Sequence, residues 1–145
     1  MTEKRTYPEY SKRYPLLIKN CMQRPLQMYP DDVAMVYRNE AGEYQRFTWQ
    51  QWHDRTCQLA HALKKLGVQT GDRIATMALN HHWHFENIYA SACTGTISHP
   101  INIRLSLDHM VHTITHAEDK IIFFDEDIKP LVEAIYDRIK DSVDA

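Results

Sequence analysis

Apolar runs of strand length alternate with helical stripes along most of this chain, and this alternation restricts the folds that it can adopt. The run Arg73–Leu79 is almost unbroken in apolar character, which is typical of a parallel strand covered on both faces. Shorter runs follow at Thr96–Ser98 and Lys120–Phe124. Residues 81–95 are expected to form a helix that is apolar over much of its circumference and well buried. Apolar residues recur at helical spacing in residues 106–117, where Ser106 is the expected N-cap, and in residues 128–139. The alternation predicts an α/β fold: a layered, mainly parallel sheet with flanking helices.

A β-hairpin is expected before this unit. Val33–Tyr37 and residues 43–48 are strand-like, and the turn sequence Asn39–Gly42 separates them. The helix that follows has the clearest signals in the chain. Thr48 and Gln51 form a capping box, and Gly67 is placed to end the helix.

The N-terminal residues differ from the rest. The first fifteen are polar and contain two prolines, so we expect an irregular arm. A helix is expected at Leu16–Tyr29, with a kink or break at Pro25. The chain therefore divides into residues 1–28, an arm and helix, and residues 29–145, an α/β unit. A parallel sheet of about three strands is small, which indicates that the sheet continues beyond this segment.

Bulk properties exclude some classes of function. A formal net charge of -2 gives no support for nucleic-acid binding, which usually requires a basic surface. The three cysteines are odd in number and widely spaced, which favours a reduced, cytoplasmic chain over a disulfide framework. No apolar signal core and no run of about 20 apolar residues is present.

Ligands of open α/β sheets bind beyond the carboxyl ends of the strands. Here those ends are residues 80–82, 99–104 and 125–127. The chain has neither a GxxxxGK[ST] loop nor a GxGxxG motif, and Thr94–Thr96 ("TGT") is too short to hold a phosphate. No Ser-His-Asp or Cys-His motif is recognisable, and Cys93 is best interpreted as a small core residue. We therefore predict no catalytic residue in the chain.

The nine histidines are candidate metal ligands. His112 and His116 have the i, i+4 spacing of a zinc-binding helix, but no glutamate follows the first of them. The favoured interpretation is solvated or hydrogen-bonded helix histidines, and no metal site is predicted. Arg104 lies in an extended loop at a strand end, where a guanidinium suits bidentate phosphate binding. On the sequence alone, a structural salt bridge is the favoured role of Arg104.

The order of short motifs resembles a known family. These motifs are F-T-W before the capped helix, A-L-x-x-L-G-V-x-x-G-D-R-I-A, P-x-N-x-R-L-S (Pro100–Ser106) and H-A-E-D-K-x-x-x-x-D (His116–Asp125). Together they resemble the N-terminal part of the AMP-forming acyl-CoA synthetases, members of the adenylate-forming superfamily. The spellings "NHHWHFE", "SHPIN" and "HAEDK" look most like medium- and long-chain fatty-acyl-CoA ligases.

The resemblance implies a two-step reaction. A carboxylic acid attacks ATP to give an acyl-adenylate, and the thiol of CoA then displaces AMP. The family's phosphate loop, its Mg²⁺-binding motif and its C-terminal lid lysine do not occur in this chain. Residues 29–145 would thus be a partial N-terminal subdomain of an adenylation domain. No cofactor is expected in the segment itself, whereas the parent enzyme would use ATP, Mg²⁺ and CoA.

The resemblance also bears on Arg104. In some members, the arginine of this loop reaches the nucleotide phosphate of CoA, and that role would fall to Arg104. The loop departs from the common family spelling at two places: His99-Pro100-Ile101 stands before Asn102, and Ile103 stands where many relatives have proline. These changes affect how the loop directs Arg104.

Three functional hypotheses follow. The leading one is the N-terminal part of an ATP-dependent fatty-acid–CoA ligase, inactive alone, whose partners are the remainder of the ligase chain and its substrates. The second is a stand-alone interaction module derived from such a ligase, which binds a full-length partner or forms a homodimer. The third is a small metal-dependent enzyme built on the histidines.

Overall fold

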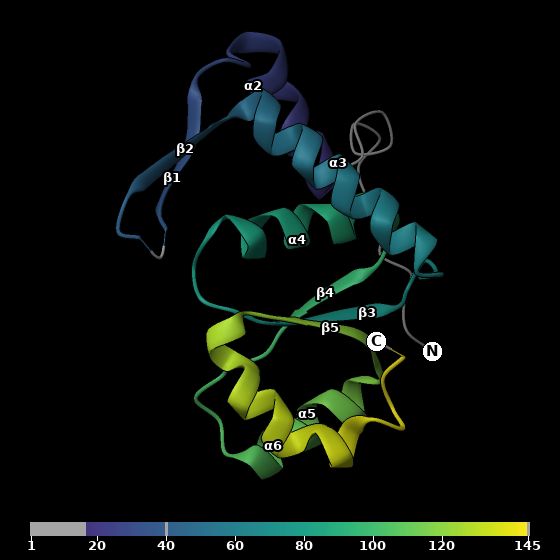
Figure 1. Ribbon diagram of the computed structural model, residues 1–145. Helices are drawn as coiled ribbons and strands as arrows, with labels where there is room; N and C mark the ends of the chain where they lie inside the picture. The colour runs from purple at the N-terminus through teal and green to yellow at the C-terminus, as the bar shows by residue number, and fades with distance from the viewer. Residues whose placement is uncertain (1–16, 40, 145) are drawn as a thin grey trace, which may run out of the picture.

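The computed structural model describes residues 17–39 and 41–144, and the arm expected at residues 1–15 lies outside the described residues. Four layers are visible in Figure 1: α3 (Trp49–Lys65) lies on α4 (His82–Thr94), α4 covers one face of a sheet, and α5 (Leu107–Ala117) and α6 (Lys129–Ile139) cover the other. The β-hairpin projects from the α3 side. The predicted α/β class, with a hairpin before the parallel sheet, is confirmed.

The hairpin pairs β1 (Val33–Arg38) with β2 (Tyr44–Thr48) in antiparallel register. Thr48 then begins α3 with the predicted capping box. The Thr48 hydroxyl accepts from the Gln51 backbone N–H at 3.2 Å, and the Gln51 side-chain oxygen accepts from the Thr48 N–H at 2.9 Å. Gly67, at φ 85°, follows the end of the helix, as its position in the sequence predicted.

The parallel sheet has three strands in the order β4-β3-β5. The central strand, β3 (Arg73–Met77), is buried on both faces, because Ile74, Ala75 and Met77 are each 0% exposed. β5 (Asp119–Phe124) matches its prediction closely. β4 (Ile97–Pro100) extends further than expected, since Pro100 belongs to the strand rather than to the following loop. A proline is tolerated there because β4 is an edge strand of this sheet.

Two cores hold the layers together. Below the sheet, β3 residues pack with α5 and α6 through Met110, Ile114 and Ile135, all 0% exposed. Above it, Leu63 of α3 and Ala90 of α4 pack on Ile74. α4 itself was expected to be an apolar, buried helix. Its buried face is instead mostly polar, consisting of His82, Glu86, Asn87, Ala90 and Ser91.

Two short segments complete the described chain. The expected N-terminal helix is a 3₁₀ turn, η1 (Ile18–Met22), followed by α2 (Gln23–Met28). Pro25 lies in the first turn of α2, where its missing N–H would have no helical partner, so it does not interrupt that helix. A second 3₁₀ turn, η2 (Glu126–Ile128), connects β5 to α6.

Candidate functional site

A groove of about 1230 Å³ lies at the carboxyl ends of β3 and β5. α3 and α4 form one wall, and the hairpin tip and the segment after β5 form the others. The groove carries both apolar side chains and groups able to hydrogen-bond. Its position is the one that the strand-end rule predicts for ligands of an open α/β sheet.

A histidine–aspartate pair lies in the lining of this groove. His81 Nε2 lies 2.6 Å from Asp125 Oδ1, and Asp125 Oδ2 accepts from the Leu79 backbone N–H at 2.7 Å. The other ring nitrogen of His81, Nδ1, accepts from the His84 N–H at 3.4 Å and caps α4. Because Nδ1 accepts a hydrogen bond, Nε2 is the protonated nitrogen, and it donates the hydrogen bond to Asp125 Oδ1. Both ring nitrogens are occupied, so the pair joins the ends of β3 and β5 and leaves His81 no free nitrogen to act as a base.

An ion pair between a half-buried arginine and a buried glutamate lies on the α3–α4 wall. Arg55 Nε and Nη2 donate to Glu86 Oε1 and Oε2 at 2.6 and 3.2 Å. The Glu86 side chain is 4% exposed, and the Arg55 guanidinium lies over the rings of Phe47 and Trp83, at 5.1 and 5.0 Å from their centroids. This bidentate pair links the hairpin, α3 and α4.

His82 is enclosed by aromatic rings beside this pair. Its ring centroid lies 4.1 Å from that of Tyr37, 5.1 Å from that of Phe47 and 4.4 Å from that of Trp83. Burial, together with the charge of Arg55, lowers the pKa of His82 from 6.5 to about 4. The imidazole is consequently neutral at physiological pH and packs as an aromatic ring.

Some polar atoms in the groove lack a partner within the described part of the chain. The hydroxyl of Thr76, a residue 2% exposed on β3, is one of them, and His84 Nδ1 is another. Burial also lowers the pKa of His84. Since buried polar groups are almost always hydrogen-bonded, these atoms are available to whatever covers the groove.

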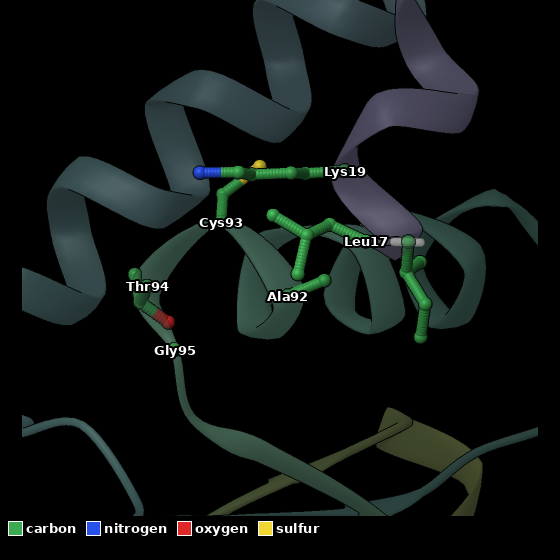
Figure 2. A pocket seen from close by; sticks show the side chains of 7 residues that line it. Leu17, Lys19, Ala92, Cys93, Thr94 and Gly95 are labelled. Atoms are coloured by element: carbon green, nitrogen blue, oxygen red, sulfur yellow. The ribbon is translucent and has the colours of Figure 1, made fainter. Parts of the chain in front are cut away.

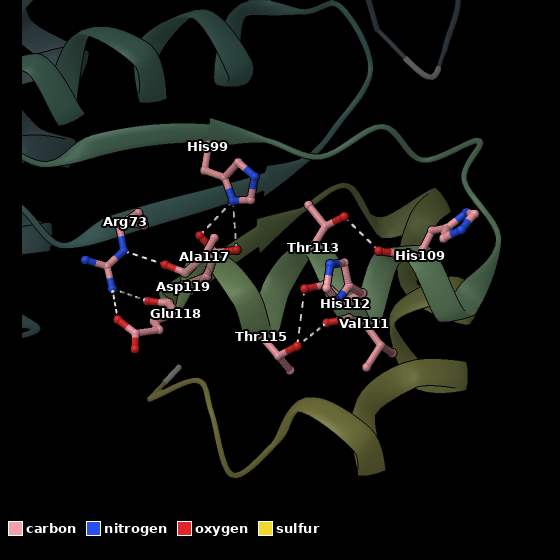
Figure 3. Close-up of polar contacts among 10 residues, drawn as sticks. All are labelled: Arg73, His99, His109, Val111, His112, Thr113, Thr115, Ala117, Glu118 and Asp119. Carbon is pink, nitrogen blue, oxygen red and sulfur yellow. Dashed lines mark hydrogen bonds and ion pairs between the residues drawn. The ribbon is translucent and has the colours of Figure 1, made fainter.

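A second histidine–aspartate pair lies on the α5 side of the sheet. Figure 3 shows His99, on β4, directed at Asp119, the first residue of β5, with Nδ1 at 2.9 and 2.8 Å from the two carboxylate oxygens. Asp119 is fully buried, and burial raises its pKa even though His99 and Arg73 act in the opposite direction. The pair crosses the central strand and connects the two edge strands.

Arg104 is not part of the groove. It lies exposed in the loop between β4 and α5, and its backbone N–H donates to Asn102 Oδ1 at 3.0 Å. Within residues 17–39 and 41–144, its guanidinium makes no ion pair of the kind that the sequence favoured.

The "TGT" segment borders a smaller hollow of about 560 Å³, lined by Leu17, Ile18 and Lys19 and by residues 92–95 (Figure 2). Gly95 adopts a left-handed conformation at the C-terminus of α4, with φ 76°. The local helix dipole therefore presents its negative end, which disfavours a phosphate. Cys93 packs against the upper core, and burial raises the pKa of its thiol.

The remaining candidates are the histidines of α5. His109, His112 and His116 are all exposed. Among the residues described, no three or more His, Cys, Asp or Glu side chains are grouped so that they could hold a metal ion. No helix of the described chain is long and apolar enough to cross a membrane.

The sequence predicts which strand ends border the site but not which side chains pair there. Asn80–His82 and Asp125–Asp127 were selected by the strand-end rule, and the structure brings His81 and Asp125 together there. Arg55 and Glu86 were missed because each is an ordinary helix residue, 31 positions from the other. Their only sequence signal is a charge on the core-facing side of a predicted helix.

Comparison with known proteins agrees with this architecture. A family model described as AMP-binding enzyme matches residues 22–144. The chain is 40% identical over 106 residues to a long-chain-fatty-acid–CoA ligase from Thermus thermophilus, a match covering 73% of this chain and 20% of that protein. It is 36% identical over 125 residues to a 3-methylmercaptopropionyl-CoA ligase from Ruegeria lacuscaerulensis, with 86% and 23% covered.

The fold matches solved structures as well. The crystal structure of a protein assigned as a long-chain-fatty-acid CoA ligase from Rhodopseudomonas palustris gives a TM-score of 0.75 at 25% identity. That match covers 86% of this chain and 30% of the other. The chain spans between a fifth and a quarter of the length of the two sequence relatives above.

Proposed function

The chain belongs to the AMP-binding enzyme family, and from this premise we propose that it is the N-terminal part of an ATP-dependent fatty-acid–CoA ligase. The observation that carries the proposal is the family match over residues 22–144, which includes every strand of the structure. A long-chain ligase among the relatives supports fatty acids as the substrate class.

The proposed reaction activates a carboxylic acid with ATP and transfers the acyl group to CoA. The sequence of this chain has no phosphate loop, Mg²⁺-binding motif or lid lysine to stabilise the charge that develops on the phosphates. Electrostatic stabilisation is usually the largest catalytic term, and losing one donor costs about 100-fold or more. The segment alone is therefore inactive, and its contribution is a folded layer on which the rest of the ligase assembles.

Within that role, Arg104 is a candidate for contact with CoA. Arg104 is exposed in the loop that follows β4, and its guanidinium has no ion-pair partner among the described residues. The Asn102 side chain accepts from the Arg104 N–H and orders the loop locally. A nucleotide phosphate would find there a donor able to form charge-assisted hydrogen bonds.

ATP–pyrophosphate exchange tests the proposed function. The isolated chain should show no exchange above a blank with octanoate or palmitate. A chimera in which residues 22–144 replace the matching segment of the Thermus thermophilus ligase should recover exchange. Exchange by the pure isolated chain, or a folded chimera without activity, would contradict the proposal.

A second candidate function is the interaction or dimerisation module. It is favoured by exposed apolar side chains that line the groove: Leu79, Trp83 and Phe124 are 51%, 57% and 43% exposed. Sedimentation equilibrium of the isolated chain distinguishes this module from a ligase segment. A discrete, saturable dimer supports the module, whereas a monomer or open-ended association supports a ligase segment.

A further inference from the structure

Helix α5 presents a histidine face to solvent. Its opposite face is buried through Met110 and Ile114, which are 0% exposed. His109, His112 and His116 lie at positions i, i+3 and i+7, which an α-helix places on one side. The packing of α5 therefore leaves three imidazoles directed away from the core.

Two of these imidazoles face each other. The ring centroids of His112 and His116 are 5.4 Å apart, and the ring planes differ by only 14°. Within the described part of the chain, neither ring makes a hydrogen bond or an ion pair. The acidic residues at the ends of α5 are already engaged: Asp108 with Arg138 at 2.8 Å, and Glu118 with Arg73 at 2.9 Å.

We propose that His112 and His116 form a two-histidine surface site for a late first-row divalent cation such as Ni²⁺, Cu²⁺ or Zn²⁺, with water as the remaining ligands. Neutral imidazole is a preferred ligand of these ions, and i, i+4 histidines on one helix face are the spacing that zinc-binding helices use. Metal–nitrogen bonds of about 2.0–2.1 Å bring two ligand nitrogens to roughly 3 Å apart. Side-chain rotation of two exposed, unpartnered rings reaches this separation without moving the helix.

The spacing alone did not favour a metal, because no glutamate follows the first histidine. The structure adds the two facts that the spacing lacks: the rings face each other, and no other group competes for them. His109 is outside the pair, since Figure 3 shows its ring directed away from His112. It is therefore a control within the same helix.

One rival pair has the same spacing on α3. Cys57 Sγ lies 3.5 Å from His53 Nε2. The thiolate is the form that binds metals, and burial and the nearby Cys93 raise the pKa of Cys57. His53 Nδ1 also contacts Asp54 at 3.2 Å. The α3 pair is consequently the weaker site.

Calorimetric titration of the 145-residue chain with Ni²⁺, in a buffer that does not coordinate metals, tests the site. We expect one saturable ion per chain. His112→Ala and His116→Ala should each weaken binding at least tenfold, which corresponds to about 1.4 kcal/mol. His109→Ala and Cys57→Ser should change the dissociation constant less than twofold. Excess Ni²⁺ should raise the thermal midpoint of the parent chain but not that of His112→Ala.

Three results would overturn the proposal. The first is the absence of saturable Ni²⁺ binding, and the second is an equal loss of Ni²⁺ affinity in His109→Ala and His112→Ala. The third is a loss of Ni²⁺ binding in Cys57→Ser alone. Circular dichroism of the metal-free variants checks the fold. If His112→Ala changes the spectrum, His112→Gln replaces it and must show the same loss of Ni²⁺ affinity.

Discussion

Two buried carboxylates of this chain are each satisfied by a side chain from another segment. Glu86 is 3% exposed and Asp119 is 0% exposed, and each carboxylate meets a cation or imidazole from another element. Removing one member of a buried pair leaves an uncompensated group, which commonly costs more than the pair itself contributes. These pairs therefore specify how α4 and β5 are placed.

His82 gives the molecule a pH-dependent stability. Well above pH 6.5 the imidazole is neutral in both the folded and the unfolded states. As the pH falls from 6.5 to about 4, the unfolded chain takes up a proton that the folded chain excludes, so the folded state loses stability. The full difference is about 3 kcal/mol, because each pKa unit is worth about 1.4 kcal/mol.

Urea unfolding at a series of pH values measures this loss. His82→Phe should flatten the dependence between pH 6.5 and 4, since the site is aromatic and 2% exposed. His61→Phe, at an exposed position of α3, should leave the pH dependence of stability unchanged. An unchanged slope in His82→Phe would assign the effect to other groups.

Arg104 permits a prediction for the ligase as a whole. In the chimera described above, Arg104→Ala should raise the KM for CoA about tenfold, through a loss of about 1.4 kcal/mol. Adenylate formation should remain nearly intact, because only the second half-reaction uses CoA. Arg46→Ala is the control, an exposed arginine on β2. Equal damage to both half-reactions, or a lower thermal midpoint with unchanged CoA dependence, would identify Arg104 as structural.

At the scale of the elements, signals within one helical turn predict the structure correctly, whereas features that depend on distant segments are not visible in the sequence. Thr48 with Gln51 and Ser106 cap helices as predicted, because a cap needs only residues within one turn. Pro100 was placed outside β4 because the sequence does not show which strand is at an edge. The polar inner face of α4 was missed because its partners, such as Arg55, come from another helix.

Gly95 and Gly67 end two helices in the same left-handed conformation but in different surroundings. A Cβ on Gly95 would lie 3.1 Å from Thr70 Oγ1 and 3.2 Å from Thr70 Cγ2, whereas one on Gly67 would have nothing within 4 Å. Left-handed strain alone costs roughly 1–2 kcal/mol for a residue with a Cβ. Gly67→Ala should therefore destabilise the chain by about 1 kcal/mol, and Gly95→Ala by clearly more.

Chemical denaturation of both glycine variants checks this difference. Adding Thr70→Ala to Gly95→Ala should recover part of the loss, because it removes the two atoms that the new Cβ meets. Equal destabilisation by Gly67→Ala and Gly95→Ala would show that Thr70 moves aside at no cost.

At the scale of the whole molecule, the two faces of the sheet are covered unequally. α5 and α6 cover the lower face with a continuous core, while the groove leaves part of the upper side open beside β5. Only β3 pairs with β5 among the described strands, so β5 has an open edge. An open edge beside exposed apolar side chains is where another segment of protein binds or where chains associate.

This asymmetry predicts different behaviour for the isolated chain and for the chimera described above. The isolated chain should bind a hydrophobic dye at the groove, because Leu79 and Phe124 are exposed there. Phe124→Gln should reduce dye fluorescence with little change in the urea midpoint, because the side chain is already 43% exposed. Tyr136→Gln, at a position on α6 that is 57% exposed, should leave the fluorescence unchanged, since Tyr136 does not line the groove. In the chimera, the rest of the enzyme should cover the groove. The dye should then bind weakly whether residue 124 is Phe or is changed by Phe124→Gln. Strong dye binding by the active chimera would show that the rest of the ligase leaves the groove open, and the apolar surface would then be a docking site for another protein.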